Sequence, residues 1–117
     1  MNLTVPRRLP SLEQIREAVA VTFGISTSDL AGGDVRVEEA IQAREAYVML
    51  ARDHTICGYI CIARANESAH SSSLDQERRG RRRLGADAGF AELVERARQM
   101  IGANPPGYRG HAAPPGL

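Results

Sequence analysis

Five arginines within six residues are the densest chemistry of this sequence: Arg78, Arg79, Arg81, Arg82 and Arg83. A guanidinium is a planar fork of N–H donors that matches phosphate oxygens and guanine. A helix that exposes such a run can hold a nucleic-acid backbone. Asp75 and Glu77 lie in the same stretch and can pair with these arginines, so the run can also be an ordinary solvated helix face. The residues leave both interpretations open.

Cysteine and histidine side chains between positions 54 and 70 raise the question of a metal site. Cys57 and Cys61 are four residues apart and so share one face of a helix, and His54 and His70 flank them. A Cys-x3-Cys pair can ligate zinc, but no second close pair completes a tetrahedral set. We therefore expect no metal and no cofactor, and we predict that both thiols are free and pack in the core.

Patterns for catalysis are weaker still. The third histidine, His111, lies in a Pro/Gly-rich stretch, and none of the three histidines has a motif-bound nucleophile beside it. Gly32-Gly33 alone is too short for a phosphate-binding loop. We expect a protein that is not an enzyme and has no small-molecule substrate.

Length and charge set the outer limits. A chain of 117 residues suffices for one modest core. Its 15 basic residues, all arginine, and 14 acidic residues give a net charge of +1, so any case for nucleic acid depends on where the charges lie. No stretch approaches the roughly 18 apolar residues of a membrane span, and no run of signal-peptide type opens the chain. We expect a cytoplasmic protein without membrane contact.

Helical signals dominate the middle of the chain. Ser11 and Gln14 have the spacing of a capping box, and an apolar stripe at helical spacing runs from Leu12 to Phe23 before Gly24 supplies a stop. Later stretches with helical patterns span residues 37–52, 69–84 and 87–101, and residues 26–30 can form one capped turn.

The run from Thr55 to Ala63 is ambiguous, because a short β-branched apolar stretch suits either a strand or a buried helix. As a short helix it completes an order typical of a helix-turn-helix domain. We predict an all-α fold, a small bundle of four to five helices over residues 11–102. A flexible arm at residues 1–10 precedes it, and a disordered Pro/Gly-rich tail at residues 103–117 follows.

Four short strings suggest a family. The sequence has A-R at 43–44 and Y-V-M-L-A-R at 47–52, then I-A-R-A at 62–65 and A-H-S-S at 69–72. With the same spacing, the C-terminal DNA-binding domain of the bacterial replication initiator DnaA has A-R-x-x-x-M-x-L-A-R, I-G-R-A and D-H-[ST]-T. The chain resembles that Trp-repressor-like helix-turn-helix domain from Ser11 to Gly102.

The resemblance implies double-stranded DNA as the partner. Residues 57–65 would form the first helix of the helix-turn-helix, and the recognition helix would begin near Ala69. The resemblance carries over contacts to bases or phosphates for His70, Ser71 and Ser72 only. The basic run is a separate argument: on the same helix we expect phosphate contacts from Arg78, Arg79, Arg81, Arg82 and Arg83, with Arg44 and Arg64 as further backbone candidates.

The string Arg52-Asp53-His54-Thr55 resembles the D-H-[ST]-T motif in a second register. In that register about 28 residues would separate the motif from the end of the first helix at Phe23, and the two further helices of the family do not fit there. We therefore predict that Arg52 ends one helix and that the next three residues link it to the following helix.

Two hypotheses of function follow. The first is a small regulator of transcription or replication that binds DNA. Ser73, Gln76 and Gly80 stand where the family has apolar residues, which would weaken docking of the recognition helix and leave Leu74 and Leu84 as its main anchors.

The second hypothesis is a protein-interaction module that keeps the fold but has lost recognition of the DnaA box. Residues 32–39 carry one arginine and three acids, which would repel DNA phosphates. In this hypothesis Ile56, Tyr59 and Ile60 face another protein or a second copy of the chain.

Overall fold

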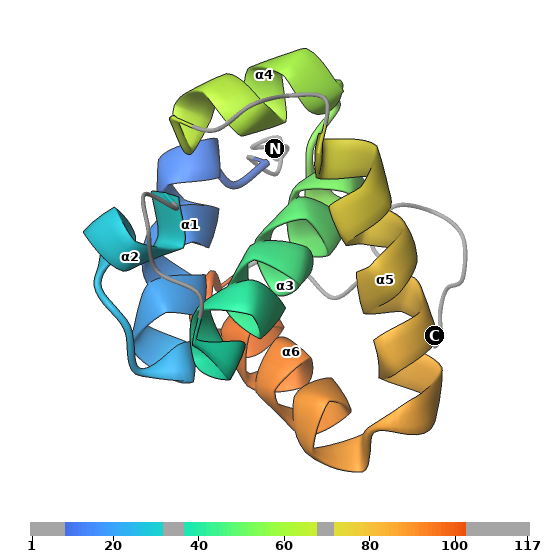
Figure 1. Cartoon of the computed structure of the whole chain (residues 1–117). Coiled ribbons are helices and arrows are strands. Elements are labelled where there is room, and N and C mark those ends of the chain that lie inside the picture. The colour runs from blue at the N-terminus through green and yellow to red at the C-terminus, as the bar shows by residue number, and fades with distance from the viewer. Residues whose placement is uncertain (1–8, 32–36, 68–71, 103–117) are drawn as a thin grey trace, which may run out of the picture.

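The computed structural model describes residues 9–31, 37–67 and 72–102, and within these ranges the chain is helical without strands (Figure 1). The helices are α1 (Leu12–Phe23), α2 (Thr27–Ala31), α3 (Glu38–His54), α4 (Tyr59–Ala65), α5 (Ser73–Ala86) and α6 (Ala88–Met100). The predicted all-α fold class is confirmed. The described residues hold six helices rather than four to five, because the capped turn is itself the short helix α2. None of these helices is long and apolar enough to cross a membrane.

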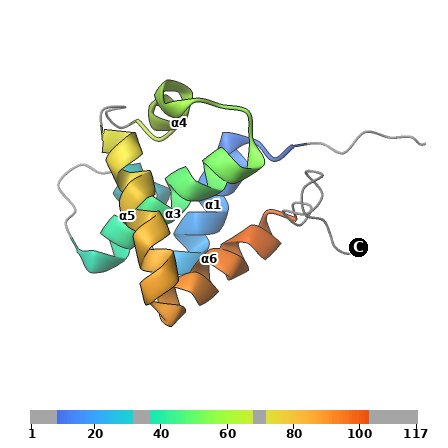
Figure 2. The same ribbon diagram turned by 90° about the vertical axis from the view of Figure 1, so that its right-hand side faces the viewer.

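Helix α3 is the centre of the fold, and the other helices pack around it (Figures 1 and 2). Every residue from 45 to 51 is buried, so these two turns leave no helix face to solvent. The buried alanines Ala43, Ala46 and Ala51 are small enough to let neighbouring helices approach closely. Val37, which the sequence pattern assigns to the apolar face, is exposed at the N-cap position instead.

Local capping signals are confirmed in the first and the last helix. The Ser11 hydroxyl accepts a hydrogen bond from the Gln14 N–H at 3.0 Å, and the Gln14 side chain accepts one from the Ser11 N–H at 2.8 Å. Gly24 ends α1 with a φ of 72°, a left-handed conformation that favours glycine. The Asp87 carboxylate accepts from the Phe90 N–H at 3.1 Å and so begins α6.

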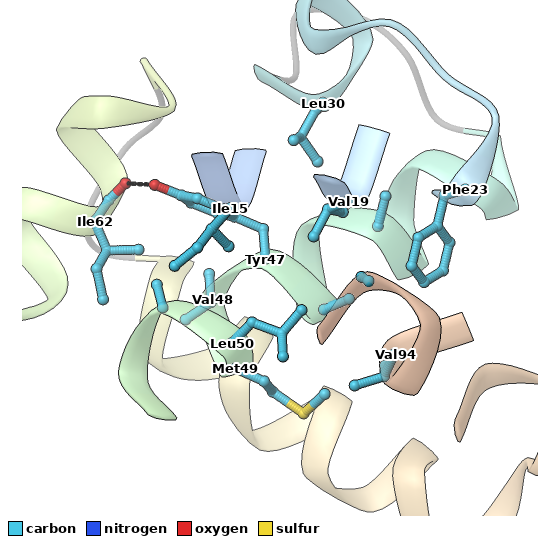
Figure 3. Close-up of a cluster of buried hydrophobic side chains, with 14 of the residues drawn as sticks. Ile15, Val19, Phe23, Leu30, Tyr47, Val48, Met49, Leu50, Ile62 and Val94 are labelled. Carbon is cyan, nitrogen blue, oxygen red and sulfur yellow. Dashed lines mark hydrogen bonds between the residues drawn. The ribbon is translucent and has the colours of Figure 1, made fainter. Parts of the chain in front are cut away.

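Helices α1, α3 and α6 share one apolar core. Ile15 and Val19 of α1 and Val94 of α6 are fully buried with the α3 side chains around them (Figure 3). The rings of Phe23 and Phe90 lie 6.1 Å apart in a tilted arrangement. Complete burial of an aliphatic side chain contributes about 2 kcal/mol, so this cluster is the main source of stability.

Helix α4 lies across the C-terminal end of α3. The buried Tyr47 hydroxyl donates to the Ile62 carbonyl at 2.7 Å, and burial raises the pKa of that tyrosine (Figure 3). The ambiguous apolar run is thus a helix, but it begins at Tyr59 rather than at residue 57. Cys57 is half-buried against the core, whereas Cys61 is exposed, so the prediction of a core thiol is wrong for Cys61.

Helix α5 packs on α3 through its smallest residue. A Cβ added at Gly80 would lie 2.9 Å from the Met49 sulfur and 3.2 Å from the Glu45 Cβ. The prediction that Gly80 weakens docking is therefore wrong, because its lack of a side chain permits the close approach. The prediction for Leu74 is also wrong, since it is 39% exposed, while Leu84 packs against the core. The helix covers residues 73–86 rather than 69–84, and residues 69–71 lie outside the described ranges.

We predict that Gly80→Val destabilises the fold by about 2 kcal/mol, because the new side chain overpacks the contact between α3 and α5. Gly85→Val is the matched control, since a Cβ at Gly85 of the same helix meets nothing within 4 Å. Urea unfolding followed by circular dichroism measures both variants. Equal stability of the two variants would contradict the close approach at Gly80.

Candidate functional site

The structure divides the five predicted phosphate-binding arginines into two groups. Because an α-helix has 3.6 residues per turn, Arg78 and Arg82 lie opposite the buried Gly80, and they are exposed together with Arg79. No ion pair involves these three within residues 9–31, 37–67 and 72–102. Arg81 and Arg83 lie on the flanks of α5 and are held by other helices.

Arg83 pairs with a buried carboxylate at the centre of the fold. Its Nε lies 2.7 Å from Glu45, whose side chain is only 1% exposed, and a second N–H donates to the other Glu45 oxygen at 3.3 Å. Glu38 lies 3.2 Å from the same guanidinium, which also covers the Phe90 ring at 5.6 Å. The hydrogen bond to Glu45 raises the pKa of Arg83. This arginine fixes α5 to α3 and α6.

Arg81 belongs to a second network, on the opposite flank of α5. Its guanidinium contacts Asp53 at 3.0 Å and Glu77 at 2.7 Å. Glu77 also accepts a hydrogen bond from the Tyr59 hydroxyl, and Arg52 stacks on the Tyr59 ring at 4.4 Å. Burial alone would raise the pKa of Glu77, but the hydrogen bonds from Tyr59 and Arg81 outweigh it and lower that pKa. The network joins α3, α4 and α5.

The string Arg52-Asp53-His54-Thr55 takes part in these contacts inside the protein. Asp53 also lies 3.8 Å from Arg98 of α6, and Arg98 donates to Nε2 of the buried His54 at 3.2 Å. Thr55 caps α3, with its hydroxyl donating to the Ala51 carbonyl at 2.7 Å. Helix α3 extends to His54, so the predicted helix end at Arg52 is wrong by two residues.

The remaining predicted contact residues are spread over the molecule. Ser72 is the half-buried N-cap residue of α5, and His70 and Ser71 lie outside the described residues. Arg44 donates to the carbonyls of Asp29 at 2.9 Å and Leu30 at 3.2 Å, and so secures the C-terminal end of α2. Burial lowers the pKa of Arg44, in keeping with this internal position. Arg64 is exposed on α4.

We call one surface the outer face of α5, defined by its exposed residues Leu74, Asp75, Arg78, Arg79 and Arg82. No family model matches this sequence, and no curated protein does. Among the described residues, no three His, Cys, Asp or Glu side chains gather as metal ligands. The outer face of α5 is therefore the surface whose chemistry is most distinctive, with three guanidinium groups on a helix that two ion-pair networks hold in place.

Sequence reasoning missed the residues that hold this helix. Glu45 lies in an otherwise small and apolar stretch of α3, and its partner Arg83 follows 38 residues later. No local pattern connects two residues that far apart. Helical periodicity does separate Arg78 and Arg82 from Arg81 and Arg83, but only once Gly80 is known to face the core.

We predict that Arg83→Ala destabilises the protein by about 3 kcal/mol, because it leaves the Glu45 carboxylate buried without its cation. Arg82→Ala, one position away on the outer face, should change stability by no more than about 0.5 kcal/mol. The free energy of unfolding in urea measures both. Similar losses for the two variants would show that the buried ion pair is not the anchor.

The lowered pKa of Glu77 predicts a loss of stability in acid. Its stabilising contribution is fully present above the unfolded-state pKa of about 4.3 and disappears as the pH falls through the lower folded-state pKa. Glu77→Gln should therefore cost about 1 kcal/mol at pH 7 and lose less further stability than the wild type between about pH 5 and pH 3. Urea midpoints measured across this range test the difference. Glu92→Gln is the control, because Glu92 belongs to an exposed surface pair with Arg96. Parallel wild-type and Glu77→Gln profiles would refute it.

Proposed function

We propose that this protein binds double-stranded DNA through the outer face of α5, as a small regulator of transcription or replication. The observation that carries the proposal is the division of the arginines on α5. Arg83 pairs with the buried Glu45, and the partly exposed Arg81 pairs with Asp53 and Glu77. Arg78, Arg79 and Arg82 are exposed and form no ion pair among the described residues. Because one face of α5 is already fixed to α3, the helix backbone loses little freedom when phosphates bind to the outer face.

The arrangement of helices supports the same proposal. Helix α4 is short, α5 follows it, and both pack on the long helix α3. This is the order that a resemblance to the DnaA C-terminal domain implies, with α4 as the first helix of the helix-turn-helix and α5 as the recognition helix. Figure 1 shows α5 on the side of α3 opposite to α1.

Spacing along the helix suits contact with a phosphate backbone. Arg78 and Arg82 are one turn apart, about 6 Å along the helix axis, and Arg79 lies beside them. Guanidinium groups at this separation can bind neighbouring phosphates of one strand. Binding of this kind releases counterions and is therefore strongly salt-dependent.

We predict that affinity for duplex DNA falls as salt rises. In a plot of log K against log salt the slope should be about −2.7 or steeper, because three arginines contact phosphates and each contact contributes about −0.9. The triple variant Arg78→Ala, Arg79→Ala, Arg82→Ala should lose this slope. Fluorescence anisotropy of a labelled duplex at several salt concentrations gives the slope for each protein.

Arg96→Ala is the matched control, because Arg96 is also an exposed arginine, on α6, where it pairs with the surface residue Glu92. This variant should keep the wild-type slope. A flat titration at low salt, or a slope that the triple substitution leaves unchanged, would exclude the outer face of α5 as a DNA-binding surface.

A second candidate function, a protein-interaction module, is favoured by one observation. Ile56 is 92% exposed before α4, and Ile60 on α4 is 53% exposed. Two exposed isoleucines four residues apart are apolar side chains that a partner protein could cover. A flat duplex titration would favour this candidate over the first.

A further inference from the structure

The first turn of the outer face of α5 differs chemically from the turns that follow it. Leu74 and Asp75 are exposed there, ahead of the three arginines. Leu74, at 39% exposure, is the one exposed large apolar side chain within the described part of α5. Asp75 lies three residues before Arg78 and four before Arg79, yet it forms no ion pair among the described residues.

These two side chains do not suit a surface that binds only phosphates. A carboxylate is repelled by the phosphate backbone, and a leucine gains nothing from phosphate oxygens. Both suit base edges in the major groove. A carboxylate accepts a hydrogen bond from the N4 amino group of cytosine, and an apolar side chain contacts the methyl group of thymine.

The position of the two residues along α5 matches that chemistry. Recognition helices of helix-turn-helix proteins contact bases through their N-terminal residues. In α5 the outward residues of the first turn are Leu74 and Asp75. Arg78 lies one turn after Leu74 on the same side of the helix, and Arg79 lies one turn after Asp75. A helix that enters the groove with its N-terminal end first would place the first turn against bases and the later arginines against the strands.

We propose that Leu74 and Asp75 determine a base preference for pyrimidines in the major groove. Asp75 accepts a hydrogen bond from the N4 amino group of a cytosine, and Leu74 packs on the methyl group of a nearby thymine. The proposal rests on the proposed function, because it requires that α5 binds duplex DNA. It adds that this binding is selective for sequence and names the residues that select.

Selection from a random duplex library at moderate salt tests the proposal with the full chain. The wild type should enrich duplexes with a cytosine at one position and a thymine near it. Asp75→Ala should lose the cytosine preference, and exchanging that C·G pair for T·A should weaken the wild type about tenfold and leave Asp75→Ala unchanged.

Uracil in place of the selected thymine removes a single methyl group. It should weaken the wild type roughly three- to fourfold and have no effect on Leu74→Ala. Both substituted residues are exposed, so loss of folding does not confound the result, and circular dichroism of each variant checks it. Glu92→Ala, an exposed acid on α6, is the control and should keep both preferences.

The outcomes separate this inference from the proposed function. Salt-dependent binding without enrichment of any base, or a cytosine preference that survives Asp75→Ala, would overturn the inference and leave duplex binding in place. Absence of binding to every duplex would overturn both.

Discussion

The buried carboxylate of Glu45 is the constraint on which the position of α5 depends. A charged group at 1% exposure on the central helix is costly unless a cation meets it with good geometry, and Arg83 does so at 2.7 Å. The same helix must approach α3 closely enough for this contact, which Gly80 permits. Ion pair and glycine together set both the distance of α5 from α3 and its rotation about its own axis.

Once the rotation of α5 is set, the roles of its other charged residues follow. Arg81 turns toward Asp53 and Glu77, where Tyr59 and Arg52 complete a network across three helices. Arg78 and Arg82, opposite Gly80, turn toward solvent. Of the five arginines in this run, two are thus held by ion pairs with α3, and three are exposed without an ion pair among the described residues. The proposed DNA-binding surface consists of the latter three.

How much of this could be predicted from the sequence depends on the range of the signals. The capping residues Ser11 and Asp87 act within three residues, so local patterns place the starts of α1 and α6 well. The pair of Glu45 with Arg83 and the close approach at Gly80 are contacts between distant segments, which no local pattern encodes. For the same reason the sequence predicts Leu74 as an anchor of this helix, although the rotation of α5 leaves it 39% exposed.

The most direct test of this division is a titration of the folded protein with duplex DNA, followed through the Nε–Hε signals of the arginine side chains by NMR. We expect the signals of Arg78, Arg79 and Arg82 to shift or broaden as DNA is added. The chemical shifts of the Arg81 and Arg83 signals should not change from those of the free protein, because both arginines keep their carboxylate partners. Shifts centred on Arg81 and Arg83, or no shift of any arginine on α5, would contradict DNA binding through the outer face of α5.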